Sequence, residues 1–301
     1  MKRNLLIMPG LLTLLAPAMA AAQQAPLPIT APKAQDTQVT VPVQAAAANI
    51  NITPRRVIFD STKRTEAVYV FNQGTTPVTV DVALVDNAML PSGEIVPISR
   101  LAERGAEGLG AKVRSAKPFV LAAPSRLILP PGQGKTIRVR ATLADTGATA
   151  EYRTHLTVTT VPPADAGLTA EQAAAAEKGE LVLRIQSVFG ISIPLIVRGG
   201  TPDATGGIGA ITPATTRDGP ALAVTLQRKG TTSLYGNLEL RTAKEVVGVA
   251  RGIAVYPEAD ERQALVPLLR PLKRGEVVTA TYSADDGKKP VEIASGSYTA
   301  P

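Results

Sequence analysis

The sequence has no cysteine and no tryptophan, and its only histidine is His155. Without cysteine the chain cannot form a disulfide, a thiolate metal site or a cysteine nucleophile, so its fold depends on hydrophobic cores alone. A single histidine also leaves too few nitrogen ligands for an ordinary zinc site. We therefore expect no metal and no cofactor.

Aromatic residues are scarce, at 3% of the chain, and the 32 lysines and arginines only modestly outnumber the 25 aspartates and glutamates. Proteins that bind nucleic acid usually carry a concentrated basic stripe interleaved with aromatic side chains. Here the positive excess is mild and spread along the chain. The sequence thus predicts no nucleic-acid partner.

Long apolar runs are also missing, apart from one at the amino terminus. Residues 1–20 resemble a secretory signal peptide, in which two basic residues precede an apolar stretch from Leu5 to Leu15, and Ala18-Met19-Ala20 provides a small-residue cleavage site. The apolar stretch is too short to span a bilayer. We expect an exported protein without membrane insertion, in which residues 21–47, rich in Pro, Ala and Gln, form a disordered tail.

From Ile50 onward the sequence consists of short strand-like runs separated by turns rich in proline and glycine. Val78–Val85 shows the pattern well, because apolar side chains occupy its even positions up to residue 84. Such strands at short, regular spacing are typical of β-sandwiches. We predict an all-β fold of two immunoglobulin-like β-sandwich domains, residues 48–199 and 203–301.

Two segments interrupt this pattern. Asn87–Lys117 is polar and rich in glycine, and we expect a long loop with a short helix there. Ala164–Gly179 is rich in alanine after a candidate helix cap at Thr169, which predicts one or two helical turns or a mobile loop.

The run from Leu181 to Arg198 is the most informative strand. Apolar residues occupy its odd positions except Ser187, and this period of two continues well beyond the ~5–6 residues of an ordinary strand. Pro194 cannot donate a backbone hydrogen bond, which indicates a sheet edge or a bulge. The run is either a buried core strand or an edge kept for pairing with another chain, because an open apolar edge is otherwise an aggregation hazard.

Catalytic motifs are not evident. His155 lies in a strand-like run, and the chain has no Gly-x-Ser-x-Gly elbow. The glycine-rich segments at 131–136 and 206–209 lack the spacing and the following helix of a phosphate-binding loop. The acidic residues Glu258, Asp260 and Glu261 are interpreted as solvated surface charge. We predict that the protein is not an enzyme.

Several segments, taken in their order and spacing, resemble the periplasmic pilus (fimbrial) chaperone family, the PapD-like chaperones of chaperone–usher systems, and indicate a divergent branch. The matching segments are ITPRRVIFD (Ile52–Asp60), VFNQGTTPVTVDV (Val70–Val82), PSRLILPPGQGKTIRVR (Pro124–Arg140), EYRTHLTVTTVPP (Glu151–Pro163), the long run Leu181–Arg198, GTTSLYGNLEL (Gly230–Leu240) and GIAVYPEADER (Gly252–Arg262). The tail before Ile50 and the long segment Asn87–Lys117 depart from the family pattern.

The resemblance implies an ATP-independent chaperone of the periplasm. Such a chaperone lends its long edge strand to a pilus or coat-like fibre subunit that lacks its own last strand, and then delivers the subunit to an outer-membrane usher. On this chain Leu181, Leu183 and Ile185, with Phe189 as a weaker candidate, would enter the groove of the subunit. The free protein is expected to be a monomer or a weak self-dimer.

The family also binds the carboxyl terminus of the subunit through an arginine and a lysine. The arginine matches Arg56, whereas the lysine falls at or beside Ser192, which carries no charge. By the resemblance, Arg56 either acts with another cation, Arg153 or Arg55, or the anchor is built differently. The alternative for Arg56 is an ordinary surface arginine on a first strand.

Two other functions remain open at this point. One is a secreted structural or adhesive protein made of two immunoglobulin-like domains, in which the strand after Leu181 would be covered. The other is a hydrolase that uses His155, because a Ser-His-Asp triad has no fixed order along a chain.

Overall fold

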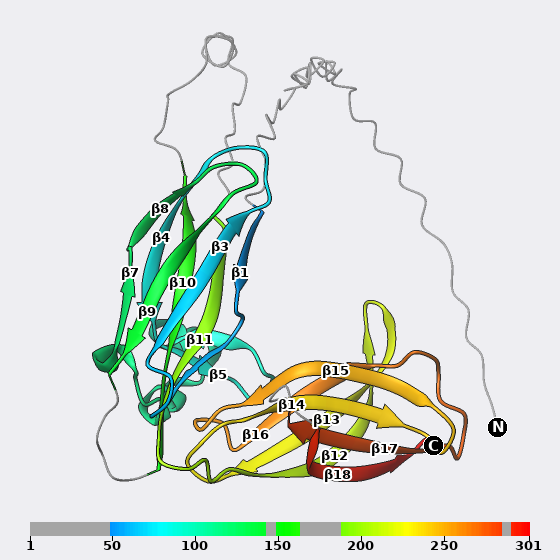
Figure 1. Cartoon of the computed structure of the whole chain (residues 1–301). Helices are drawn as coiled ribbons and strands as arrows, with labels where there is room; N and C mark the ends of the chain where they lie inside the picture. Colours follow the sequence, from blue (N-terminus) through cyan, green and yellow to red (C-terminus); the bar gives the residue numbers. More distant parts are fainter. Residues whose placement is uncertain (1–48, 143–148, 163–187, 285–289) are drawn as a thin grey trace, which may run out of the picture.

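The computed structural model describes residues 49–142, 149–162, 188–284 and 290–301. They form two β-sandwiches that lie across one another in an L shape, as Figure 1 shows. The prediction of an all-β fold with two immunoglobulin-like sandwiches is confirmed. Each sandwich encloses a hydrophobic core of its own.

The first sandwich packs a four-stranded sheet of order β1-β3-β9-β7 against a five-stranded sheet of order β2-β11-β10-β4-β8. Its strands are β1 (Ile50–Thr53), β2 (Val57–Phe59), β3 (Thr65–Asn72), β4 (Val78–Val85), β7 (Val120–Ala123), β8 (Arg126–Leu129), β9 (Gly134–Ala141), β10 (Ala150–Val161) and β11 (Gly190–Gly199). Alternate side chains of both sheets fill the core, among them Phe59, Leu156 and Leu195.

The amino-terminal part of this sandwich is divided between the two sheets. β1 pairs in antiparallel fashion with β3, whereas β2 pairs in parallel with β11. The parallel pairing is short and extends only over Leu195, Ile196 and Val197 of β11. Because β2 is so short, the part of β11 before Leu195 forms an edge of the sheet.

The segment Asn87–Lys117 is more ordered than the sequence analysis predicted. It contains a hairpin of β5 (Asn87–Met89) and β6 (Ile95–Pro97), which the expected long loop missed. Four 3₁₀-helices follow, namely η1 (Ile98–Arg100), η2 (Ala102–Arg104), η3 (Glu107–Lys112) and η4 (Lys117–Phe119). The segment folds around a small cluster of its own with Leu101 at the centre, and that cluster gives the short strands a buried side.

The second sandwich packs a sheet of order β12-β13-β16 against one of order β15-β14-β17-β18. Its strands are β12 (Thr205–Thr216), β13 (Gly219–Lys229), β14 (Leu234–Arg241), β15 (Val246–Val255), β16 (Glu261–Pro267), β17 (Val277–Ala284) and β18 (Val291–Thr299).

β12 was not predicted, because its glycines and threonines hide the strand pattern. The glycine at 206 has a packing reason, since a Cβ there would lie 2.4 Å from Cγ2 of Ile293 in β18. The two sheets approach so closely at residue 206 that only glycine fits there, although glycine usually weakens a strand.

In the described part of the chain, no helix has the length and apolar character needed to cross a membrane. The same residues contain no cluster of three or more His, Cys, Asp or Glu side chains that could hold a metal ion.

Candidate functional site

The outer edge of β11 is open over its first half. On one side, β10 pairs with β11 from Gly190 to Gly199. On the other side, β2 covers only Leu195–Val197, so within the described residues the stretch Gly190–Pro194 has no neighbouring strand. Pro194 lies on this edge, as the sequence predicted. Proline is accommodated there because no neighbouring strand on that side needs a hydrogen bond from its backbone nitrogen.

Exposed apolar side chains lie directly before this edge. Val188 is 60% exposed and Phe189 is 41% exposed. The backbone of Phe189 still pairs with β10, because its N–H donates to Oγ1 of Thr160 and its carbonyl accepts from the Thr160 N–H. Leu181, Leu183 and Ile185 lie outside the described residues.

The two faces of β11 differ. Ile193, Leu195 and Val197 are buried in the core of the first sandwich. Ser192 lies on the opposite face, is exposed, and its hydroxyl is 2.8 Å from that of Thr157 on β10. No hydrogen bond or ion pair joins Ser192 to Arg56, although both are described residues.

Arg56 lies between β1 and β2 and points to the second sandwich. Its guanidinium carbon is 4.5 Å from the ring centre of Tyr235 and 5.9 Å from that of Tyr256. Nη2 donates to Oγ of Ser233 at 3.1 Å, whereas Nε and Nη1 are buried without a hydrogen-bond partner. Burial lowers the pKa of Arg56, but its intrinsic pKa is so high that the group remains a cation.

A second cation lies beside Arg56. Nη2 of Arg198 on β11 is 3.1 Å from the same Ser233 hydroxyl, and its Nε donates to Oε2 of Glu151 at 2.9 Å. Ser233 donates to Oε2 of Glu151 from both its N–H and its hydroxyl. Glu151, Arg198 and Ser233 therefore tie the two sandwiches together next to Arg56. None of the three was predicted from the sequence as a site residue.

Arg153 forms a buried ion pair across the same junction. Arg153 is 3% exposed and Glu258 only 2%, and two parallel hydrogen bonds join the guanidinium to the carboxylate. Arg153 also donates to the carbonyl of Asn87, and the N–H of Met89 donates to Oε1 of Glu258 at 2.8 Å. The guanidinium carbon lies 3.7 Å from the ring centre of Tyr256.

This pair corrects one prediction. Glu258 was interpreted as solvated surface charge together with Asp260 and Glu261, but it is fully enclosed. The other two acids are exposed as expected. The loop before β16 folds against the first sandwich at Glu258, so only the side chain that meets Arg153 is desolvated.

No protein-family model matches the sequence, and no curated protein is similar to it. Similar folds are found among solved structures. The structural neighbours are pilus chaperones.

Three of these structures illustrate the likeness. The YadV chaperone is 15% identical, with a TM-score of 0.42, and the match covers 83% of this chain and 98% of that one. The CupB2 chaperone of Pseudomonas aeruginosa is 13% identical, with a TM-score of 0.41 and coverage of 83% and 100%. A chain of the CsuC–CsuE chaperone–tip adhesion subunit complex from the archaic chaperone–usher Csu pili of Acinetobacter baumannii is 12% identical, with a TM-score of 0.44 and coverage of 82% and 99%.

His155 is buried on β10, 3% exposed, and its Nδ1 atom has no hydrogen-bond partner among the described residues. A catalytic triad requires an acidic group at that nitrogen to orient the ring. Burial, and to a smaller extent the charge of Arg153, lowers the pKa of His155 to about 3. The ring is therefore neutral at ordinary pH.

The lowered pKa of His155 predicts a loss of stability in acid. Between pH ~6.5 and ~3 the unfolded chain binds a proton at His155 that the folded protein does not, so the free energy of unfolding falls as pH falls. The loss approaches about 1.4 kcal/mol per pH unit. We expect His155→Leu to remove this component, so that the wild type loses about 2–3 kcal/mol more than the variant between pH 7 and pH 4.5 in urea titrations. Equal losses would show that His155 titrates normally in the folded state.

Proposed function

We propose that this protein is an ATP-independent periplasmic chaperone that caps pilus or fimbrial subunits and delivers them to an outer-membrane usher. The observation that carries the proposal is the open edge of β11 at Gly190–Pro194, preceded by exposed Val188 and Phe189. A structural or adhesive sandwich would gain nothing from an uncovered apolar edge, which risks aggregation. The resemblance of the sequence to the pilus chaperone family supports the same function.

The physical basis is strand addition. An extended edge offers main-chain hydrogen bonds to a subunit that lacks a strand, and alternate side chains provide specificity. Ile193 faces the core of the first sandwich. Side chains an even number of residues away lie on the same face of a continuous strand, and these include Leu181, Leu183, Ile185 and Phe189. Once the strand extends into the subunit, this face would fill the open core of the subunit. Each fully buried leucine or isoleucine contributes roughly 1.5–3 kcal/mol.

The carboxyl terminus of the subunit would bind at Arg56. Two of its guanidinium nitrogens, Nε and Nη1, have no partner among the described residues, so each is a donor that a carboxylate would satisfy. Arg198 is the accompanying cation that we propose, because it shares the Ser233 hydroxyl with Arg56. Ser192 could add one hydrogen bond, and Arg153, already paired with Glu258, would contribute only a positive field.

The remaining parts of the proposal concern organisation. We propose a signal peptide at 1–20, a disordered tail at 21–47, and two domains at 48–199 and 203–301. The free protein would be a monomer or a weak self-dimer, with no nucleic-acid partner, no cofactor and no catalytic activity.

Replacing Arg56 with alanine tests the anchor. Co-expression in a bacterial periplasm with a pilus subunit that lacks its last strand should give a stable 1:1 complex with the wild type, measured by size-exclusion chromatography. We expect Arg56→Ala to reduce the complex at least tenfold. The variant should lose only about 1–2 kcal/mol of stability, from the stacking on Tyr235 and the hydrogen bond to Ser233.

Arg55 supplies the matched control, since it is the adjacent arginine and is exposed. Arg55→Ala should leave the complex unchanged. Undiminished capture by Arg56→Ala, or loss of capture in Arg55→Ala, would refute the assignment of Arg56. Failure of the wild type to form any complex would refute the chaperone function itself.

A further inference from the structure

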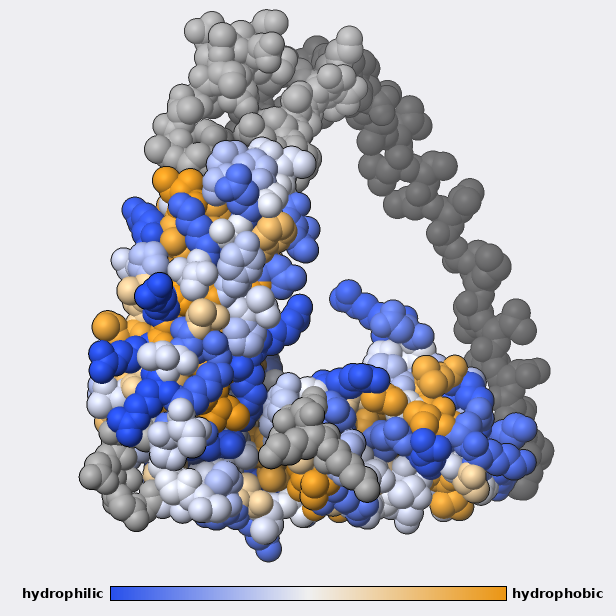
Figure 2. All heavy atoms as spheres, in the orientation of Figure 1, coloured by the Kyte–Doolittle hydropathy of each residue, from blue (hydrophilic) through white to orange (hydrophobic). Residues whose placement is uncertain are grey.

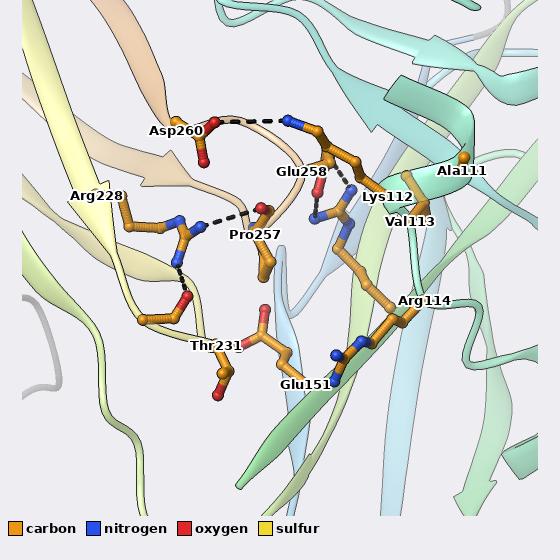
Figure 3. A pocket seen from close by; sticks show the side chains of 12 residues that line it. Ala111, Lys112, Val113, Arg114, Glu151, Arg228, Thr231, Pro257, Glu258 and Asp260 are labelled. Atoms are coloured by element: carbon orange, nitrogen blue, oxygen red, sulfur yellow. Dashed lines mark hydrogen bonds and ion pairs between the residues drawn. The ribbon is translucent and has the colours of Figure 1, made fainter. Parts of the chain in front are cut away.

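A polar pocket of about 460 Å³ lies at the junction of the two sandwiches. Its walls come from the end of η3 and the two residues after it, from β10, from the end of β13 and the turn that follows, and from the loop before β16. Figure 3 shows Arg114 and Arg228 entering it from opposite sides, with the carboxylate of Glu151 between them in this view. The segment 111–114 belongs to Asn87–Lys117, which the chaperone function does not use.

The charges in this pocket do not balance. Each acidic residue in the wall already has a cation: Glu258 pairs with Arg153, Asp260 with Lys112, and Glu151 with Arg198. Two arginines in the wall have no carboxylate partner among the described residues. These are Arg114 and Arg228.

Arg228 is 5% exposed, and its two terminal nitrogens make three hydrogen bonds to carbonyl oxygens. Nη1 donates to Gly230 and Thr232, and Nη2 donates to Pro257. Carbonyls hold the guanidinium in place but do not neutralise it. Arg114, by contrast, is exposed at the rim, and its side chain makes no hydrogen bond or ion pair with a described residue. The pocket therefore has uncompensated positive charge on two of its walls, held in place at Arg228 and exposed at Arg114, and this charge attracts an anion.

Three buried polar atoms without hydrogen-bond partners indicate which groups the ligand carries. Nε of Arg228 and Nε of Arg153 are donors without an acceptor, and Oε1 of Glu151 is an acceptor without a donor. All three residues line the pocket and are at least nine-tenths buried. Leaving such groups unpaired is costly, so a ligand that pairs with them gains affinity. The complementary molecule carries an anionic group next to a hydrogen-bond donor.

We propose that this pocket binds a small hydroxy- or amino-carboxylate, independently of subunit capture. The carboxylate accepts from the Arg114 side chain and from Nε of Arg228, and the hydroxyl or amino group turns toward Glu151 and donates to its Oε1. The volume of about 460 Å³ is at the lower end of the about 300–1,000 Å³ of small-molecule sites, so a molecule of a few carbon atoms fits with room to spare. Because the wall includes both sandwiches, the ligand also stabilises their junction.

Malate and succinate provide a matched pair of probes that differ by one hydroxyl group. Isothermal titration of the full mature protein should show saturable binding of malate, at least fivefold tighter than that of succinate. Malate should also raise the melting temperature above that in sodium chloride of equal ionic strength. Arg114→Gln should weaken malate binding about tenfold, because the exposed side chain supplies one of the two uncompensated charges.

Arg104→Gln is the control variant, because Arg104 lies in the same segment but pairs with Glu94 on the surface. It should bind malate like the wild type. Three results would each overturn the proposal: no saturable binding of malate, equal binding of malate and succinate, or undiminished binding by Arg114→Gln with an unchanged melting temperature.

Discussion

Changing Leu183 and Ile185 together to threonine should abolish capture of a pilus subunit while the protein stays folded. Both residues lie outside the described part of the chain, and the expectation comes from their parity with Phe189 and Ile193 on one strand. Threonine keeps the preference for extended backbone but removes the apolar surface that would fill the groove of the subunit. Loss of two buried anchors would cost roughly 3–6 kcal/mol of binding, at 1.5–3 kcal/mol each.

The measurement is again the 1:1 complex after periplasmic co-expression, together with urea denaturation of the free protein. The double variant should lose less than about 1 kcal/mol of stability, as surface substitutions do. Ile193→Thr is the matched control, since Ile193 is 2% exposed and part of the core. That substitution should cost at least about 2 kcal/mol. If the double variant destabilises the protein as much as Ile193→Thr does, Leu183 and Ile185 are core residues and strand donation loses its physical basis.

Glu258→Gln should be among the most destabilising single substitutions in the protein. It leaves the Arg153 guanidinium buried at the junction without a counter-charge, and breaking a buried pair in this way costs about 3–5 kcal/mol. The effect should appear as a lower urea midpoint. It should also appear as faster hydrogen exchange at Met89, whose N–H donates to Glu258.

The surface pair Asp81–Arg126 provides the control. Both side chains are substantially exposed, so Asp81→Asn should change stability by less than about 1 kcal/mol. Adding Arg153→Met to Glu258→Gln should recover part of the loss, because the uncompensated charge is then removed. A loss of less than about 1 kcal/mol in Glu258→Gln would mean that the junction opens easily and that water solvates Arg153.

Strand identity was largely determined by the sequence. The alternation of Val78–Val85 predicted β4, and the strand-like run that contains His155 corresponds to β10. The reason is local: a strand with one buried face must alternate, and a shift of one residue would turn every apolar side chain to solvent. Pro194 likewise indicated an edge, because a missing N–H is a property of that residue alone. β12 escaped prediction in part because Gly206 is required by the close approach of Ile293, a residue of a different strand.

The candidate site depended on tertiary structure. Arg56 was singled out by its resemblance to a family motif, but its contacts with Tyr235, Tyr256 and Ser233 join residues nearly two hundred positions apart. Nothing near Glu258 in the sequence distinguishes it from the exposed Asp260, since a charged residue carries no local sign of burial. The sequence by itself determined which segments are strands and which faces are apolar. Only the packing of one sandwich on the other decided which charges are desolvated and paired, because desolvation depends on what covers a side chain and not on its neighbours along the chain.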